Sequence, residues 1–289
     1  MKKLSIQDLW IRVILFFAIC VILIFSFQVF ALRIVRELFN NGNPFPSILE
    51  TNIVRAMNGI VGIGLVYVFL QFDRQKMDIA GFSWNREFGW EWILLSIPIT
   101  IAGLIPTLII EWFFDIIFIP SDVIENPVVL IDPIGILLTF IATFFAIALG
   151  EEILFRGYLQ TILETRYSFF FAAVISALLF GLLHFLLLAP TGDLDDMFAI
   201  LFSAFAIGLT FSYAFKTTKY NLILPVAIHG VWDFIIFVFQ AEFQYIDFFA
   251  ALMEILASIV GASIIFLLVH LYANKRLALV MTDEDESFE

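Results

Sequence analysis

Long apolar segments alternate with short polar ones along the whole chain. Eight of these segments approach the length of a membrane-spanning helix, which needs roughly 20 mostly apolar residues. They lie near Trp10–Leu32, Ile53–Phe72, Glu91–Ile110, Ile134–Phe155, Phe169–Ala189, Phe198–Phe215, Leu222–Phe239 and Phe248–Tyr272. The pattern predicts an all-α, polytopic integral membrane protein with about eight transmembrane helices.

Small residues and prolines mark two of the predicted helices. The second contains Gly59, Gly62 and Gly64, which would let another helix approach closely. The third contains Pro98 and Pro106, and we expect them to kink it.

Composition supports a membrane environment. Of the 289 residues, 62% are hydrophobic and 15% charged, whereas a soluble domain has roughly 45–50% apolar and about 25% charged residues. With no repeat, linker or soluble domain in the pattern, residues 1–289 are expected to form a single transmembrane domain. The run Trp10–Leu32 is too long for a cleaved signal peptide. The single cysteine, Cys20, allows no disulfide within the chain.

Lysine and arginine predict the orientation, because these residues gather on the cytoplasmic side of a membrane. With a cytoplasmic N-terminus and eight spans, twelve of them face the cytoplasm and three face outward: Arg33, Arg36 and Arg55. Both termini are therefore predicted to be cytoplasmic. The acidic stretch at about 281–289 then forms a short cytoplasmic tail, and we expect no nucleic-acid partner.

Ionisable groups inside spans cost at least ~2.5–3.5 kcal/mol each on insertion scales and are therefore candidates for function. The fourth span contains Glu151, Glu152 and Arg156. Glu152 and Arg156 are four residues apart on one helix face, so we expect a structural ion pair. Glu151 points about 100° away and has no partner in its own helix. A buried unpaired carboxylate is expensive unless it is used, which favours a functional role.

The fifth span contains His184. If the chain turns at Tyr167 and Ser168, Glu151 lies sixteen residues before the turn and His184 sixteen after it. Two antiparallel helices would then place both at the same depth. Such a pair suits a general base or two ligands of one metal ion. A lone histidine bonded to a backbone carbonyl is the alternative.

The seventh span contains His229 and Asp233, four residues apart and therefore on one helix face. A structural His–Asp hydrogen bond without chemistry is an equal alternative when these two residues are taken alone. Glu111 and Asp115 lie beside Trp112, a residue typical of the membrane interface, so we expect them to be solvated and assign them no role.

Three motifs in succession resemble a known family. Glu-Glu-x-x-x-Arg at Glu151, Glu152 and Arg156, Phe-x-x-x-His at Phe180 and His184, and His-x-x-x-Asp at His229 and Asp233 are similar to those of the CPBP intramembrane proteases. These are the type II CAAX prenyl endopeptidases and their bacterial relatives, the Abi or bacteriocin-processing group. The resemblance covers about residues 137–239, and the other spans match only in hydrophobicity.

The resemblance implies a role for each residue. Glu151 and His184 would bind and deprotonate the attacking water, and His229 with residue 233 would stabilise the oxyanion. Asp233 departs from a pattern with asparagine, because an ionised aspartate repels an oxyanion whereas an amide donates to it. It would then be protonated or would orient His229.

The cofactor question stays open at this point. Glu151, His184, His229 and Asp233 form a plausible zinc set, but no His-Glu-x-x-His motif is present. We favour metal-independent glutamate chemistry, with no cofactor.

Other functions remain in competition with the peptidase. A catalytically silent scaffold or immunity-type regulator could use the same fold, and an ion-coupled transporter could use the same polar residues. The peptidase would act on a peptide or membrane-protein substrate within the lipid bilayer, in the cell membrane of a prokaryote. Its specific substrate and its oligomeric state do not follow from the sequence.

Overall fold

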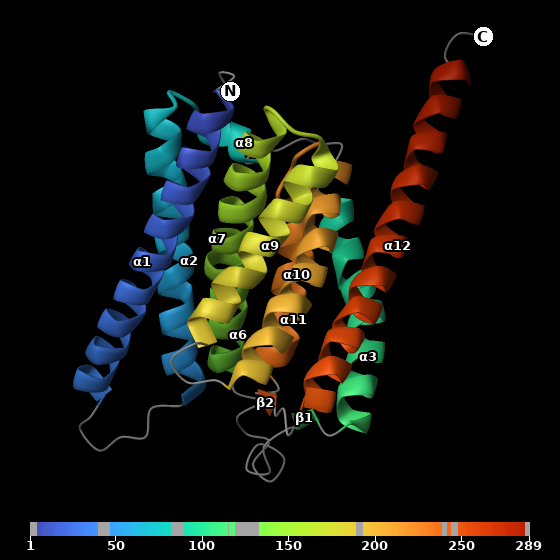
Figure 1. Cartoon of the computed structure of the whole chain (residues 1–289). Coiled ribbons are helices and arrows are strands. Elements are labelled where there is room, and N and C mark those ends of the chain that lie inside the picture. Colours follow the sequence, from blue (N-terminus) through green and yellow to red (C-terminus); the bar gives the residue numbers. More distant parts are fainter. Residues whose placement is uncertain are drawn as a thin grey trace.

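A computed structural model describes residues 5–39, 47–81, 90–114, 116–118, 133–188, 193–238, 242–243 and 248–286. In these ranges, eight long helical segments stand side by side in one bundle (Figure 1). All eight correspond to the apolar segments of the sequence. The prediction of an all-α polytopic membrane protein is confirmed.

The helical segments in chain order are α1 (Ile6–Phe39), α2 (Ser47–Phe72), α3 (Trp90–Phe113), a continuous run over residues 133–164, α9 (Phe169–Leu188), α10 (Leu194–Thr217), α11 (Ile223–Val238) and α12 (Phe248–Glu286). The continuous run consists of α6 (Pro133–Ile141), η3 (Ala142–Ala148), α7 (Leu149–Glu152), η4 (Ile153–Gln160) and α8 (Thr161–Glu164). A 3₁₀ turn, η1 (Met77–Ala80), follows α2, and two-residue strands β1 (Ile117–Phe118) and β2 (Glu242–Phe243) pair antiparallel.

Neighbouring helices are arranged so that the run 133–164 lies inside the bundle. α1 packs on α2, and α2 packs on the run at η3, α7 and η4. On the other side, α9 packs on α10, α10 on α12, and α12 on α3 (Figure 1). α11 contacts both α3 and the run.

Six of the helices in the described ranges are long and apolar enough to cross a membrane. The apolar parts of the other two, Ala56–Phe72 in α2 and all of α11, are shorter. At 1.5 Å per residue, the 16 residues of α11 extend about 24 Å, less than the roughly 30 Å of hydrocarbon. His229 and Asp233 therefore lie on a short helix that depends on its neighbours.

Two predicted helix ends were wrong because polar residues extend the helices beyond their apolar segments. The fourth span was expected to end near Phe155, yet the helix continues to Glu164. Arg156 and Gln160 are fully buried there, and each forms side-chain hydrogen bonds. α10 begins at Leu194 rather than near Phe198, which puts acidic residues in its first turn, where the helix dipole favours negative charge.

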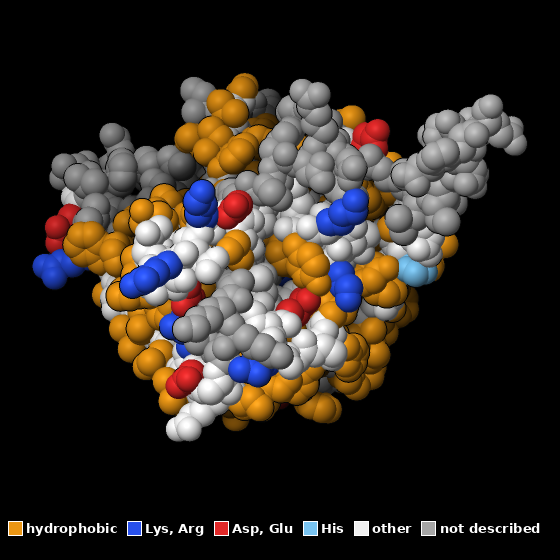
Figure 2. Space-filling model, turned by 90° about the horizontal axis from the view of Figure 1, so that it is seen from above, with side chains coloured by type: hydrophobic (Ala, Val, Ile, Leu, Met, Phe, Trp, Pro, Cys, Tyr) orange, Lys and Arg blue, Asp and Glu red, His pale blue; other side chains and the backbone are white. Residues whose placement is uncertain are grey.

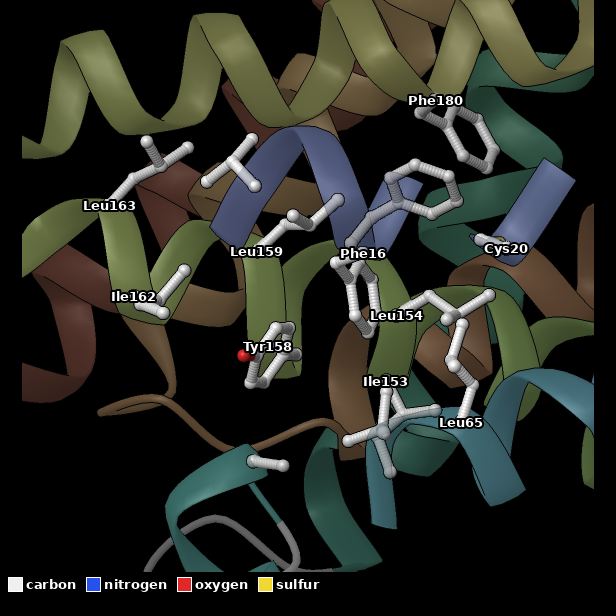
Figure 3. Close-up of a cluster of buried hydrophobic side chains, with 14 of the residues drawn as sticks. Phe16, Cys20, Leu65, Ile153, Leu154, Tyr158, Leu159, Ile162, Leu163 and Phe180 are labelled. Atoms are coloured by element: carbon white, nitrogen blue, oxygen red, sulfur yellow. The ribbon is translucent and has the colours of Figure 1, made fainter. Parts of the chain in front are cut away.

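A buried apolar cluster holds the run 133–164 against its neighbours. Ile153, Leu154, Tyr158 and further residues of the run pack against side chains of α1, α2 and α9 (Figure 3). Phe16 of α1 lies against the Tyr158 ring, with 4.5 Å between the ring centroids. The segment that contains Glu151 and Glu152 is thus anchored immediately after its acidic residues.

The first turn of α1 and the last turn of α12 lie at the same end of the bundle (Figure 1). Lys and Arg side chains spread over that end, while hydrophobic side chains cover the flanks (Figure 2). Both observations agree with an even number of spans, and the cytoplasmic assignment of this end stays a prediction. α12 extends to Glu286, but the side chains of the acidic tail at 281–289 lie outside the described residues.

Candidate active site

Unusual helix geometry flanks the two glutamates. α7 holds Glu151 and Glu152 between two π-helical stretches, η3 and η4. Such wide turns are rare and occur frequently at functional sites. Nothing in the apolar periodicity of the sequence indicated them.

Close backbone packing fixes the position of this helix. A Cβ atom on Gly150 would come within 2.3 Å of the Gly59 Cα, and one on Gly59 within 1.8 Å of the carbonyl oxygen of Ala146. Gly62 is also tightly packed, whereas a Cβ on Gly64 would meet nothing within 4 Å. The predicted close approach of another helix is confirmed for Gly59 and Gly62 but not for Gly64.

Glu152 and Arg156 form the expected buried ion pair. Arg156 Nη1 donates to Glu152 Oε1 at 2.9 Å, and both side chains are fully buried. Arg156 Nη2 donates to the carbonyl oxygen of Gly208 on α10, also at 2.9 Å. The guanidinium lies over the rings of Phe180 and Phe211, 4.6 and 5.2 Å from their centroids. These contacts compensate the buried positive charge.

His184 is held in one tautomer by its own helix. Its Nδ1 lies 2.9 Å from the carbonyl oxygen of Phe180, and a carbonyl can only accept, so Nδ1 carries a proton and donates it. Nε2 therefore remains free to face the site, 3.9 Å from Glu151 Oε2. The expected level match of Glu151 and His184 is confirmed, and the intervening chain turns at residues 165–168.

His229 is held in a corresponding way by Glu152. Its Nδ1 lies 2.9 Å from Glu152 Oε1, the same oxygen that accepts from Arg156, so Nδ1 is the donor. Its ring stacks on Phe211 at 4.9 Å. Nε2 faces Glu151 Oε2 at 3.8 Å and Asp233 Oδ2 at 3.5 Å. Glu152 thus connects the ion pair to the site, a link that motif spacing did not reveal.

Some side chains of the candidate active site are partly exposed, and others are buried. The side chains of Glu151, His184 and Asp233 are 23%, 26% and 20% exposed, whereas His229 is 7% exposed and Glu152 not at all. Glu151 Oε2 makes no hydrogen bond within the described structure. The side chains of Glu151, His184 and Asp233 are therefore partly accessible, although Glu151 Oε2 itself is buried, and His229 and Glu152 are shielded.

The spacing of these groups is wide for a metal ion. Zinc bonds of about 2.0–2.1 Å in a tetrahedron would bring ligand atoms to about 3.3–3.4 Å of one another. Glu151 Oε2 lies 3.9 and 3.8 Å from the two Nε2 atoms. Within the described ranges, no group of three or more His, Cys, Asp or Glu side chains has a metal-holding arrangement.

Two polar residues outside the motifs differ from expectation. Glu111 is not solvated at the interface, as predicted, but 2% exposed in the bundle, where it contacts Glu254 of α12. Burial was missed because helix α3 packs that face against α12 rather than toward the interface. Asp115 lies outside the described residues.

A comparison with known protein families finds a match over the region that contains the motifs. Residues 133–235 match the family described as type II CAAX prenyl endopeptidase Rce1-like. This range nearly coincides with the segment of about 137–239 in which the motifs were found, and it contains all seven motif residues. A search of curated proteins gave no match. Over residues 133–235, the chain is similar to the type II CAAX prenyl endopeptidase Rce1-like family.

Proposed function

We propose that the protein is an intramembrane endopeptidase in which Glu151 and His184 activate a water molecule. Its substrate is a peptide or a membrane-associated protein, and its membrane is the cell membrane of a prokaryote. The observation that carries the proposal is the position of Glu151 Oε2, 3.9 and 3.8 Å from the Nε2 atoms of His184 and His229.

These separations suit a bridging water. They exceed the 2.7–3.2 Å of a direct N–H···O hydrogen bond, and a polar contact beyond about 3.5 Å is a place where one water fits between the groups. Because neutral His184 donates through Nδ1 to Phe180, its Nε2 accepts. The two hydrogens of the water would then bond to Glu151 and His184, and its oxygen lone pair would face the substrate.

The path of the proton follows from this arrangement. The water oxygen attacks the carbonyl carbon of the scissile bond while Glu151 takes one of its protons as general base. The tetrahedral intermediate collapses by breaking the C–N bond, and Glu151 returns the proton to the leaving amine nitrogen. The products are an amine and a carboxylic acid, and the acid loses its proton, the second hydrogen of the water, to solvent.

His229 is the proposed oxyanion donor. Its Nδ1 is committed to Glu152, so its Nε2 can donate only when the ring carries a proton on both nitrogens. Glu152, Asp233 and Glu151 surround the ring and would compensate its charge. In this scheme, Asp233 orients His229 at 3.5 Å rather than binding the oxyanion. Preorganised donors of this kind supply much of an enzyme's rate enhancement.

The proposal is tested with protein purified in detergent and a library of peptides. We expect the wild type to cleave some of the peptides and Glu151→Ala to cleave none. A chelator separates this chemistry from zinc catalysis: we expect cleavage to survive it. Loss of cleavage with a chelator and its return with added zinc would assign the same four side chains to a metal instead. A well-folded wild type that cleaves none of the peptides would contradict the peptidase proposal for this substrate class.

A further inference from the structure

A second group of buried polar side chains lies outside the candidate active site, where α3, α10 and α12 meet. Glu111 of α3 and Glu254 of α12 are 2% and 5% exposed, and Ser203 of α10 is 3% exposed. Glu111 is near the end of α3 and Glu254 near the start of α12, and these two helix ends lie at the end of the bundle opposite the first turn of α1 (Figure 1). Buried carboxyl groups in membrane spans are expensive and mark functional sites by default.

The two carboxyl groups lie close enough to each other for a hydrogen bond. A bond between two carboxyl groups requires one proton, because two carboxylates have no donor. The pair with its shared proton then carries one negative charge. None of the ion pairs among the described residues includes either glutamate. A buried charge of this kind needs compensation by a cation or by a second proton.

Buried oxygen atoms without a hydrogen-bond partner lie around this charge. Glu111 Oε2, Glu254 Oε2 and Ser203 Oγ are buried and have no hydrogen-bond partner among the described residues. Ser203, from a third helix, lies within reach of a hydrogen bond to Glu254, as Glu111 does. Ser258, one turn along α12, donates to Glu254 Oε1 at 3.3 Å. A second proton would leave most of these lone pairs unused, whereas a bound cation would take them as ligands.

We propose that Glu111, Glu254 and Ser203 form a binding site for a monovalent metal cation, Na⁺. The donor atoms are all oxygens, which hard cations prefer. One positive charge neutralises the pair that shares a proton, whereas a divalent ion would leave an excess positive charge in the membrane. The cation would join α3, α10 and α12, and α3 and α12 lie outside the segment that matches the protease family.

The test is the melting temperature of the purified protein in detergent. NaCl is replaced stepwise by choline chloride at constant ionic strength, and unfolding is followed with a thiol-reactive dye at Cys20, which is buried and is the only cysteine. A ligand that binds only the folded state raises the melting temperature as its concentration increases. We expect a saturable rise of several degrees with Na⁺ for the wild type and none for Glu254→Gln or Glu111→Gln.

Serine variants guard against glutamate variants that fail to fold. Ser203→Ala should shift the midpoint of the response to higher Na⁺. Ser212→Ala should leave it unchanged, since Ser212 is an equally buried serine of α10 whose Oγ also has no hydrogen-bond partner. Glu151→Gln should respond as the wild type does, which would separate this site from the active site.

Four results would overturn the proposal. Equal melting temperatures in NaCl and choline chloride would leave the site without a monovalent ligand. A rise on acidification alone would assign it a second proton, and a rise with CaCl₂ but not NaCl would assign it a divalent ion. An equal Na⁺ response in the wild type and Ser203→Ala would place the cation elsewhere.

Discussion

Two imidazole rings at the site of Glu151 are each fixed through Nδ1 and present Nε2 to the same carboxylate. His184 uses a backbone carbonyl of its own helix, and His229 uses the carboxylate of Glu152. Each Nδ1 donates to an oxygen acceptor, so Nε2 is the nitrogen of each ring that is left to face Glu151. The partner of His184 is thus a neutral carbonyl group, and the partner of His229 is a carboxylate.

The role of His184 can be measured against that of Asp233. His184→Ala should reduce kcat/KM by about 10²–10⁴, because it removes one of the two groups proposed to hold the water. Asp233→Asn should have a much smaller effect and could increase the rate, since an amide keeps a polar contact with His229 and does not repel the oxyanion. The rates of peptide cleavage at saturating and at low substrate concentrations give kcat and kcat/KM for each variant. Equal losses in the two variants would contradict the division of roles.

Arg156 provides a residue-level test of folding. Arg156→Ala leaves Glu152 buried without its cation, a change that typically costs ~3–5 kcal/mol, so the yield of folded protein and its melting temperature should fall. Arg33→Ala is the matched control, because Arg33 forms the same i,i+4 pair with Glu37 at an exposed position and exposed pairs contribute little. Size-exclusion profiles measure the yield of folded protein, and melting curves measure the melting temperature. Equal yields and melting temperatures in the two variants would refute the structural role of Arg156.

At the scale of elements, α2 positions the helix that carries Glu151 and Glu152 through backbone contact. Gly59 touches the run 133–164 beside Ala146, one turn before Glu151. Glu151 and Glu152 are adjacent in α7, between the π-helical stretches η3 and η4, so their side chains point about 100° apart and reach different partners. One faces the histidines of α9 and α11, and the other joins Arg156 to His229.

A glycine pair on α2 tests this contact. Gly59→Ala should lower the melting temperature and the peptidase activity, because its Cβ would overlap the backbone at Ala146 and overpacking costs typically 1–3 kcal/mol. Gly64→Ala should be neutral or slightly stabilising, since nothing lies within 4 Å of the added atom and alanine favours a helix over glycine. If both variants behave alike, α2 does not position the site through Gly59.

Sequence pattern predicted the elements and the motif residues, but not every contact between elements. Eight apolar runs and the i,i+4 spacing of Glu152 and Arg156 depend on local periodicity, and both are confirmed. The bond from His229 to Glu152 joins residues 77 positions apart, and the burial of Glu111 depends on how α3 packs against α12. Such facts arise only from helix packing, which one sequence without relatives does not report.

At the scale of the whole molecule, orientation in the membrane decides from which side a substrate arrives. Reporter fusions at the N-terminus and after residue 289 should both report the cytoplasm, because twelve of the fifteen Lys and Arg residues would face that side. A fusion in the segment 189–192, between α9 and α10, should report the outside and serves as the control. An external signal from either terminal fusion would contradict the predicted topology.

The helices α1, α2, α3 and α12 enclose a family-matched core of 103 residues, 133–235. α2 touches the helix that carries Glu151 and Glu152 directly, while α3 and α12 carry the buried Glu111 and Glu254 pair. The parts of the chain outside the matched segment therefore contribute both support for the candidate active site and a separate group of buried polar side chains. Activity of the protein is expected to require the complete bundle.

The central claim is that Glu151 accepts a proton from the attacking water, and the kinetics of Glu151→Gln test it most directly. Glutamine keeps the shape of glutamate and can still hydrogen bond, but it cannot accept that proton. We predict an unchanged melting temperature and a fall in kcat/KM of about 10²–10⁴ for a cleavable peptide. Full peptidase activity in a folded Glu151→Gln protein would contradict the account.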